Sequence, residues 1–252
     1  AVNRAAADGK VVNYAAQNLA VATGPNTALS LDMGGADGEL LRASGDFNLN
    51  VMDFVALRGN LAIERKTAVL RKADIAVTGL DEAGDVNTEL LTIGGKGLDA
   101  FAGVNADSVN AMGLALRDVS FGLAMAQESG VLNPSEWLAL QASAGSIAVV
   151  GVEQLSASAS NLSVAINRAD ANGVVLDFAD THALSVRTGK GTTQTLDMAG
   201  SQGELLRGSG TVTMEVAGFV RATGNVAFER SSGAVRVTGD SSDTAVEMLQ
   251  VG

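Results

Sequence analysis

The only histidine of the chain, His182, is the first residue to consider for general-base or nucleophilic chemistry. It lies two residues after Asp180, and a Ser–His–Asp arrangement requires both residue types. A second, similar segment has Gln17 near the matching position, and glutamine cannot act as a base. The sequence also lacks a G-x-S-x-G segment, a phosphate-binding loop and a two-histidine metal motif. Two carboxylates alone can cleave polysaccharides, but no pair differs from the acids of the turns, so we predict no enzymatic activity.

Acidic residues gather in glycine-rich turns, and this pattern points to calcium. Calcium prefers about six to eight oxygen ligands from carboxylates and carbonyls, which such turns can supply. The candidate calcium ligands are Asp32, Asp37, Asp170 and Asn172. The alternative is that Asp, Asn and Gly simply form turns, since neither a D-x-D-x-D-G loop nor a nonapeptide calcium repeat is present. Another acidic cluster runs from 81 to 85.

Charged pairs recur at matching places in the two similar segments, as Glu64–Arg65 and Glu229–Arg230. Such pairs could join two structural units by ion pairs across their junction. The alternative, which we favour, is a solvated strand end where an exposed ion pair contributes little stability. Two arginines also lie near aspartates to which they could bridge, Arg42 near Asp32 and Arg207 near Asp197.

The elements that must position these residues are indicated by strict alternation from Leu41 to Ile63. Successive side chains of a strand point to opposite faces, so the pattern predicts strands with one apolar face and one polar face. The stretch Leu206–Phe228 repeats the alternation. The apolar positions of the first stretch are Leu41, Ala43, Phe47, Leu49, Val51, Val55, Leu57, Leu61 and Ile63.

Two parts of the chain repeat one sequence with an offset of about 165 residues. The opening A-V-N-R-A-A-A-D-G-K-V-V-N-Y returns as A-I-N-R-A-D-A-N-G-V-V-L-D-F, and L-D-M-G-G-A-D-G-E-L-L-R returns as L-D-M-A-G-S-Q-G-E-L-L-R. We predict one full unit over 1–164 and a partial second copy over 165–252 that matches 1–94. Such a unit is too long for one solenoid coil, so it must contain several strands.

Residues 95–164 occur only once, and their pattern predicts further strands with local breaks. The alternation changes parity at Arg117–Asp118 and near Asn161, which indicates a β-bulge or a corner at each place. The glycine-rich stretch 97–105 suggests a turn. Asn133 followed by proline and glutamate suggests the start of a short helix. Trp137, the only tryptophan, is expected to anchor the core.

Composition excludes several functional classes. The net charge of −11 argues against nucleic acid, which needs a basic surface, and against anionic membranes. Cysteine is absent, which removes thiol catalysis, disulfides and zinc–thiolate sites. No apolar run is long enough to cross a membrane, so we expect no membrane insertion. Without an initiator methionine or a signal peptide, the chain is expected to be part of a longer protein.

The recurring phrases L-L-R-x-S-G, G-F-V-x-x-x-G-N, D-A-F-A-G-V-N and N-L-S-V-A-I-N resemble the tandem repeats of giant bacterial surface and adhesin-like proteins. This resemblance runs along most of the chain, implies an extracellular structural or adhesive stalk, and carries over no catalytic residue. A second similarity is to the β-groove repeats of bacterial lipid-transfer bridge proteins, in which a long sheet curls around acyl chains.

The predicted fold is all-β, with an elongated repeat architecture that is either a β-solenoid or a long folded sheet and at most one or two short helices. The predicted function is a structural segment of an extracellular or cell-surface bacterial filament, stalk or adhesin. Its partners would be neighbouring repeats or copies of itself, assembled end to end. The alternative is a module that binds glycans, surfaces or lipid. Abundant Ala and Gly at the apolar positions favour tight filling over an open lipid groove.

Overall fold

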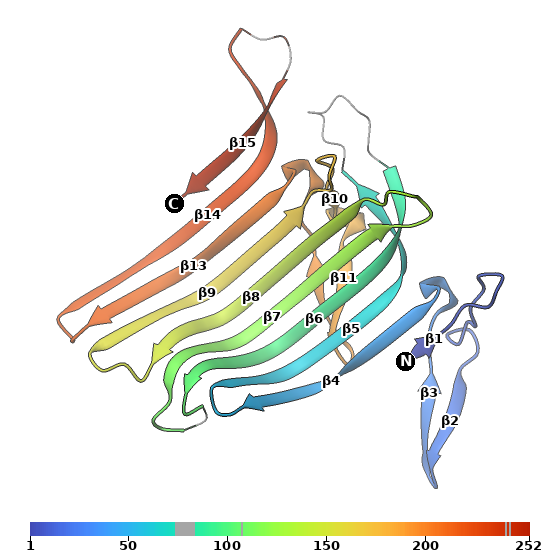
Figure 1. Ribbon diagram of the computed structural model, residues 1–252, viewed down its shortest axis with the longest axis horizontal. Helices are drawn as coiled ribbons and strands as arrows, with labels where there is room; N and C mark the ends of the chain where they lie inside the picture. The colour runs from blue at the N-terminus through green and yellow to red at the C-terminus, as the bar shows by residue number, and fades with distance from the viewer. Residues whose placement is uncertain (74–83, 107, 240, 242) are drawn as a thin grey trace.

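The computed structural model describes residues 1–73, 84–106, 108–239, 241 and 243–252. The fold is all-β, as predicted, and one large antiparallel sheet dominates it (Figure 1). The sheet is open, with β1 and β15 at its two ends, and no solenoid coil forms within the described residues. Among these residues the only helical segments are three short 3₁₀ turns, and none could span a membrane.

Most strands of the sheet pair with the next in the chain, and the two exceptions along its order are the steps from β1 to β4 and from β9 to β13. In spatial order the strands are β1 (Val2–Asn3), β4 (Leu40–Val51), β5 (Val55–Lys72), β6 (Gly84–Val104), β7 (Met112–Glu128), β8 (Glu136–Val150), β9 (Leu155–Arg168), β13 (Leu205–Val216), β14 (Val220–Arg236) and β15 (Asp243–Val251). The short β10 (Leu176–Asp177) pairs with β5.

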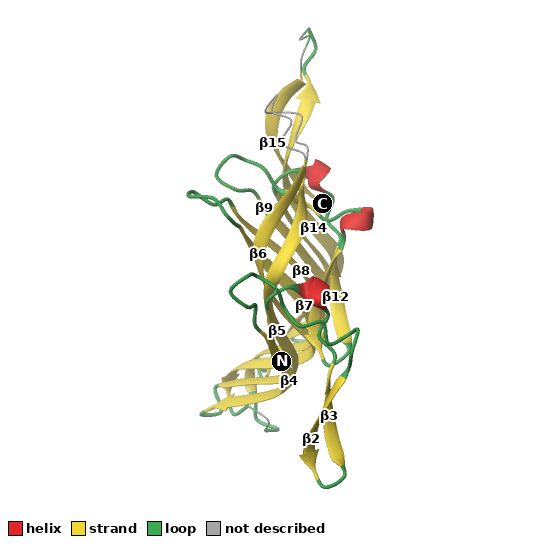
Figure 2. Ribbon diagram, turned by 90° about the vertical axis from the view of Figure 1, so that its right-hand side faces the viewer, coloured by secondary structure: helices red, strands yellow, loops and turns green. Residues whose placement is uncertain are grey.

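Two separate hairpins complete the fold, β2 (Leu19–Gly24) with β3 (Thr27–Leu31) and β11 (Leu184–Gly189) with β12 (Thr192–Leu196). The 3₁₀ turns are η1 (Gly35–Asp37), η2 (Asp180–His182) and η3 (Gly200–Gln202), drawn red in Figure 2.

The alternation of Leu41–Ile63 forms β4, a tight turn and the first half of β5, as predicted. The two predicted parity changes are β-bulges. Asp118 and Asn161 both have φ of 51°, and the strand register shifts beside each of them. Asp and Asn tolerate positive φ better than most residues, which explains why the bulges fall there.

Two local predictions are wrong. Residues 97–104 lie within β6 rather than in a turn. No helix begins at Asn133, because β8 starts at Glu136 and pairs with β7 from its first residue. Trp137 is buried, as predicted, and its indole N–H donates to the carbonyl of Val174 at 3.0 Å. Sheet pairing and burial of this ring override the local helix signal.

The two similar segments share six elements in the same order, and the second also contains β10 and η2, which have no counterpart among the elements of the first. The first has β2, β3, η1, β4, β5 and β6, and the second has β11, β12, η3, β13, β14 and β15. They differ in what their hairpins do. The hairpin β11–β12 packs across strands β5 to β8, whereas β2–β3 projects away from the sheet (Figure 1).

The main core lies between the large sheet and the segment 174–198 that crosses it. Its members come from both copies of the repeated sequence, so neither copy forms this core alone. The buried residues of this cluster are Leu70, Val86, Leu90, Ala124, Ala126, Trp137, Ala139, Leu176, Phe178, Val186, Leu196, Met198 and Leu205.

Candidate functional site: two faces of one sheet

The two faces of the large sheet differ in what covers them. Directly opposed residues of paired strands point to the same face, so the register assigns each residue to one face. One face carries the odd-numbered residues of β4 with their partners, and we call it the apolar face. The other carries the even-numbered residues of β4, and we call it the hairpin face because β11–β12 packs on it.

The hairpin face is flat where β11 crosses it. Gly94 of β6 and Gly122 of β7 are directly opposed. A Cβ atom on Gly94 would lie 2.2 Å from the carbonyl oxygen of Arg187, and one on Gly122 would lie 3.2 Å from Cβ of Val186. Glycine at both positions therefore lets the hairpin backbone approach the sheet, which is a recognised role of glycine within strands.

Glu64 joins the sheet to the hairpin by charge. Its buried carboxylate accepts a hydrogen bond from Arg42 at 2.5 Å and lies 3.0 Å from Lys66 and 3.3 Å from Arg187 of β11. Burial opposes ionisation, but hydrogen bonds from Arg42 and Lys66 outweigh it and lower the pKa of Glu64 below its usual 4.5. Glu64 therefore pairs across the two copies and lies within β5, so the solvated strand end that we favoured is wrong for this residue.

The matching arginine of the second copy, Arg207, donates to Glu229 at 2.6 Å, as Arg42 does to Glu64. Arg42 also lies 3.8 Å from Asp37. The arginines thus pair with glutamates of the neighbouring strand, and the predicted bridges to Asp32 and Asp197 are not the contacts that form.

The apolar face carries the alternating apolar residues predicted from the sequence, but no element within the described residues covers it. Large side chains lie exposed on it from β4 to β15, and the most exposed is Val251 at 79%. The exposed set is Leu41, Phe47, Leu49, Val51, Val55, Ile63, Val69, Val104, Met112, Leu114, Leu155, Val164, Leu206, Val212, Met214, Val216, Val220, Val226, Phe228, Leu249 and Val251. Tight filling by small residues, which we expected, does not occur here.

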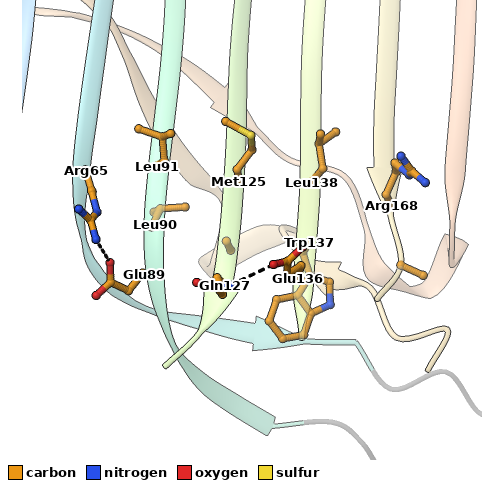
Figure 3. A pocket seen from close by; sticks show the side chains of 12 residues that line it. Arg65, Glu89, Leu90, Leu91, Met125, Gln127, Glu136, Trp137, Leu138 and Arg168 are labelled. Carbon is orange, nitrogen blue, oxygen red and sulfur yellow. Dashed lines mark hydrogen bonds and ion pairs between the residues drawn. The ribbon is translucent and has the colours of Figure 1, made fainter. Parts of the chain in front are cut away.

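Charged and polar residues border the apolar face at one end of the strands. Figure 3 shows Leu91, Met125 and Leu138 in one row across neighbouring strands, with Arg65 on one side and Arg168 on the other. These side chains line a shallow groove of about 600 Å³. The polar pairs that line this groove are Arg65–Glu89 at 2.5 Å and Gln127–Glu136 at 3.0 Å. Farther along the same end of the sheet lie Arg168–Glu204 at 4.0 Å and Arg230–Glu247 at 2.9 Å. The groove therefore combines an apolar floor with a charged edge.

The candidate calcium ligands lie in separate turns. Asp170 and Asn172 come together, because Asp170 accepts hydrogen bonds from the backbone N–H groups of Asn172 and Val174, each at 2.9 Å. The Ser135 hydroxyl also donates to Asp170, at 2.7 Å. Asp37 lies in η1, and Asp32 lies between β3 and η1. The described residues contain no group of three His, Asp or Glu arranged to hold a metal ion, so calcium binding stays a prediction. Of the acidic cluster at 81–85, residues 81–83 lie outside the described residues.

His182 lies in η2, where its Nδ1 atom is 3.8 Å from a carboxylate oxygen of Asp177. The imidazole is half-exposed and lies within the segment 174–198 that crosses the sheet. The sequence-based arguments missed the opposed glycines Gly94 and Gly122. Only Gly122 gave a signal, since it lies between Phe121 and Leu123 in a predicted strand, whereas Gly94 is followed by Gly95 and Lys96. Comparisons of the chain with protein-family models, curated proteins and solved structures found no match.

Proposed function

We propose that this chain is a structural segment of a tandem-repeat protein of the bacterial cell surface, of the filament, stalk or adhesin kind, whose units join end to end. The observation that carries the proposal is the junction between the two copies. Strand β9 of the first pairs with β13 of the second along nearly its whole length, and hairpin β11–β12 crosses back over the first.

Two features of the protein, its strand edges and its acidic charge, support this elongated role. The terminal strands of the sheet leave backbone groups at both edges, and such edges pair readily with further strands. The acidic charge keeps separate molecules apart in solution while permitting specific joining. The function proposed is thus mechanical, namely extension of a continuous β-sheet by one unit at a time.

Electron microscopy of the native protein tests this proposal. We expect extended particles whose length increases with the number of units in the chain. Small-angle scattering of the 252-residue chain should likewise give an elongated shape. A compact, isolated particle in both measurements would contradict the structural role.

A second function is favoured by the uncovered apolar face. Monomeric proteins rarely expose a large continuous apolar surface unless it binds something. The face here carries aliphatic side chains with few hydrogen-bonding groups, which suits acyl chains rather than glycans. The charged edge around Arg65 and Arg168 would then lie near a polar headgroup. We propose lipid binding on this face as the alternative function.

Mass spectrometry of lipid extracted from the purified protein tests the alternative. Met214 and Thr213 are neighbours on β13 that point to opposite faces, with Met214 on the apolar face. Met214→Asp should reduce any bound lipid several-fold, and the matched Thr213→Asp should leave it unchanged. Equal lipid content in both variants, or no lipid in the wild type, would contradict lipid binding.

A further inference from the structure

The hairpin β2–β3 is exposed at every residue except Leu31. Its counterpart β11–β12 shows what such a hairpin covers when a preceding unit is present. Val186 and Leu196 of the counterpart are 0% exposed against the sheet, whereas the matching Val21 is 42% exposed. The two hairpins share the same strand pairing and a register shift at the same glycine, Gly24 or Gly189.

The segment before each hairpin shows the same contrast. Leu176 pairs with β5 and is 2% exposed, while the matching Val12 is 55% exposed. Even so, the local anchor of the segment is identical in the two copies. The Asn3 side-chain amide donates to the carbonyl of Val12 at 2.8 Å, and that of Asn167 donates to the carbonyl of Leu176 at 2.8 Å. The same asparagine-to-carbonyl hydrogen bond therefore anchors the start of each segment.

Strand β4, which follows this hairpin, pairs with β1 in the same register in which β13 pairs with β9. Val2 and Asn3 of β1 pair with Leu41 and Leu40 of β4. In the second copy, Ile166 and Asn167 of β9 pair with Leu206 and Leu205 of β13 in the same way. The short β1 thus occupies the place of the last residues of β9, and β4 presents the edge that β9 occupies on β13.

The chemistry of the exposed hairpin is more apolar than that of its docked counterpart. Ala22 replaces Arg187, which pairs with Glu64, and Leu29 replaces Gln194, which lies over Gly122. Leu29 is 59% exposed. A surface that fits this hairpin must therefore offer a flat apolar patch, and the pair of opposed glycines on β6 and β7 offers one.

We propose that β2–β3 docks on the hairpin face of another copy of the unit 1–164, over the strands equivalent to β5–β8, while β4 pairs with the strand equivalent to β9. The inference rests on the end-to-end joining proposed above and names the surfaces that carry it. The occupant is a copy of this unit because the second copy, with a matching sequence, already makes these contacts on the first.

The test is a chain in which residues 1–164 are duplicated before Ala1. The new junction, Val164–Ala1, reproduces the existing junction Val164–Ala165. Amide hydrogen exchange in the β2–β3 hairpin that follows the new junction should slow at least about tenfold relative to the 252-residue chain and approach that of β11–β12, whereas the copy before the junction should exchange as it does now. Val21→Asp should abolish the slowing, whereas Ala20→Asp, on the outward side of the same strand, should not.

Two outcomes separate this inference from the proposed function. Scattering that shows one continuous elongated particle, together with fast exchange in β2–β3 of the duplicated chain, would overturn hairpin docking while end-to-end joining stands. Scattering that shows two compact particles connected by a flexible link would overturn the joining itself. Slowed exchange that Val21→Asp does not change would also overturn docking through this face.

Discussion

The two hairpins have the same strand pairing but different surroundings. The hairpin β11–β12 buries Val186 and Leu196 on the sheet of the first copy, whereas β2–β3 projects away from the sheet (Figure 1) and leaves Val21, the match of Val186, 42% exposed. Their own sequences do not explain the difference, because the exposed hairpin is the more apolar of the two. What differs is the presence of a sheet to cover. The main core therefore contains residues of both similar segments, and β2–β3 has no such sheet beneath it.

The same substitution should lower the free energy of unfolding by different amounts in the two hairpins. Val186→Asp would place a charge where no water reaches and should reduce the free energy of unfolding by about 3 kcal/mol or more. Val21→Asp, at the matching exposed position, should change it by about 0.5 kcal/mol or less. Urea denaturation of the 252-residue chain measures both. Equal effects at the two positions would show that β11–β12 is not packed as described.

Substitution of an opposed glycine should give the next largest loss of stability. Gly94→Val would bring Cβ against the carbonyl oxygen of Arg187 and should destabilise the protein by about 2 kcal/mol through overpacking. At Gly252, the matching residue of the second copy, an added Cβ atom would have no neighbour within 4 Å. Gly252→Val is therefore the control and should be neutral. Faster hydrogen exchange confined to β11 in Gly94→Val would identify loss of docking as the cause.

The sequence predicted the strands and their faces better than their partners. Alternation at Leu49 and its neighbours assigned them to one face, and the parity changes located the bulges at Asp118 and Asn161. Alternation cannot say what covers a face, because that depends on segments distant in the chain. The docking of Val186 over Gly122 is one such long-range contact. The failed helix at Asn133 has the same origin, since a short local signal lost to pairing of β8 with β7.

Acid should weaken the docked hairpin through Glu64. Because its pKa is lowered in the folded state, its carboxylate stabilises the protein above pH 4.5, and this contribution is lost as pH falls through the folded pKa. Glu64→Gln should cost about 1.5 kcal/mol at neutral pH and make unfolding less dependent on pH below about 4.5. Glu229→Gln, which has no hairpin above it, should cost less. Parallel pH profiles for wild type and Glu64→Gln would contradict this role.

Calcium should have the smallest effect on stability. Its test compares the turn at Asp170 with the matching turn at Asp8. Asp170 already accepts hydrogen bonds from Ser135, Asn172 and Val174, so a calcium ion must compete with these donors and bind weakly. Weak binding at millimolar calcium stabilises by about 1 kcal/mol or less. We expect calcium, relative to a chelator, to raise the unfolding midpoint slightly in wild type and in Asp8→Asn, but not in Asp170→Asn. If calcium leaves the wild-type midpoint unchanged, these acids serve only to form turns. An equal rise in all three proteins would move the site to Asp32 and Asp37.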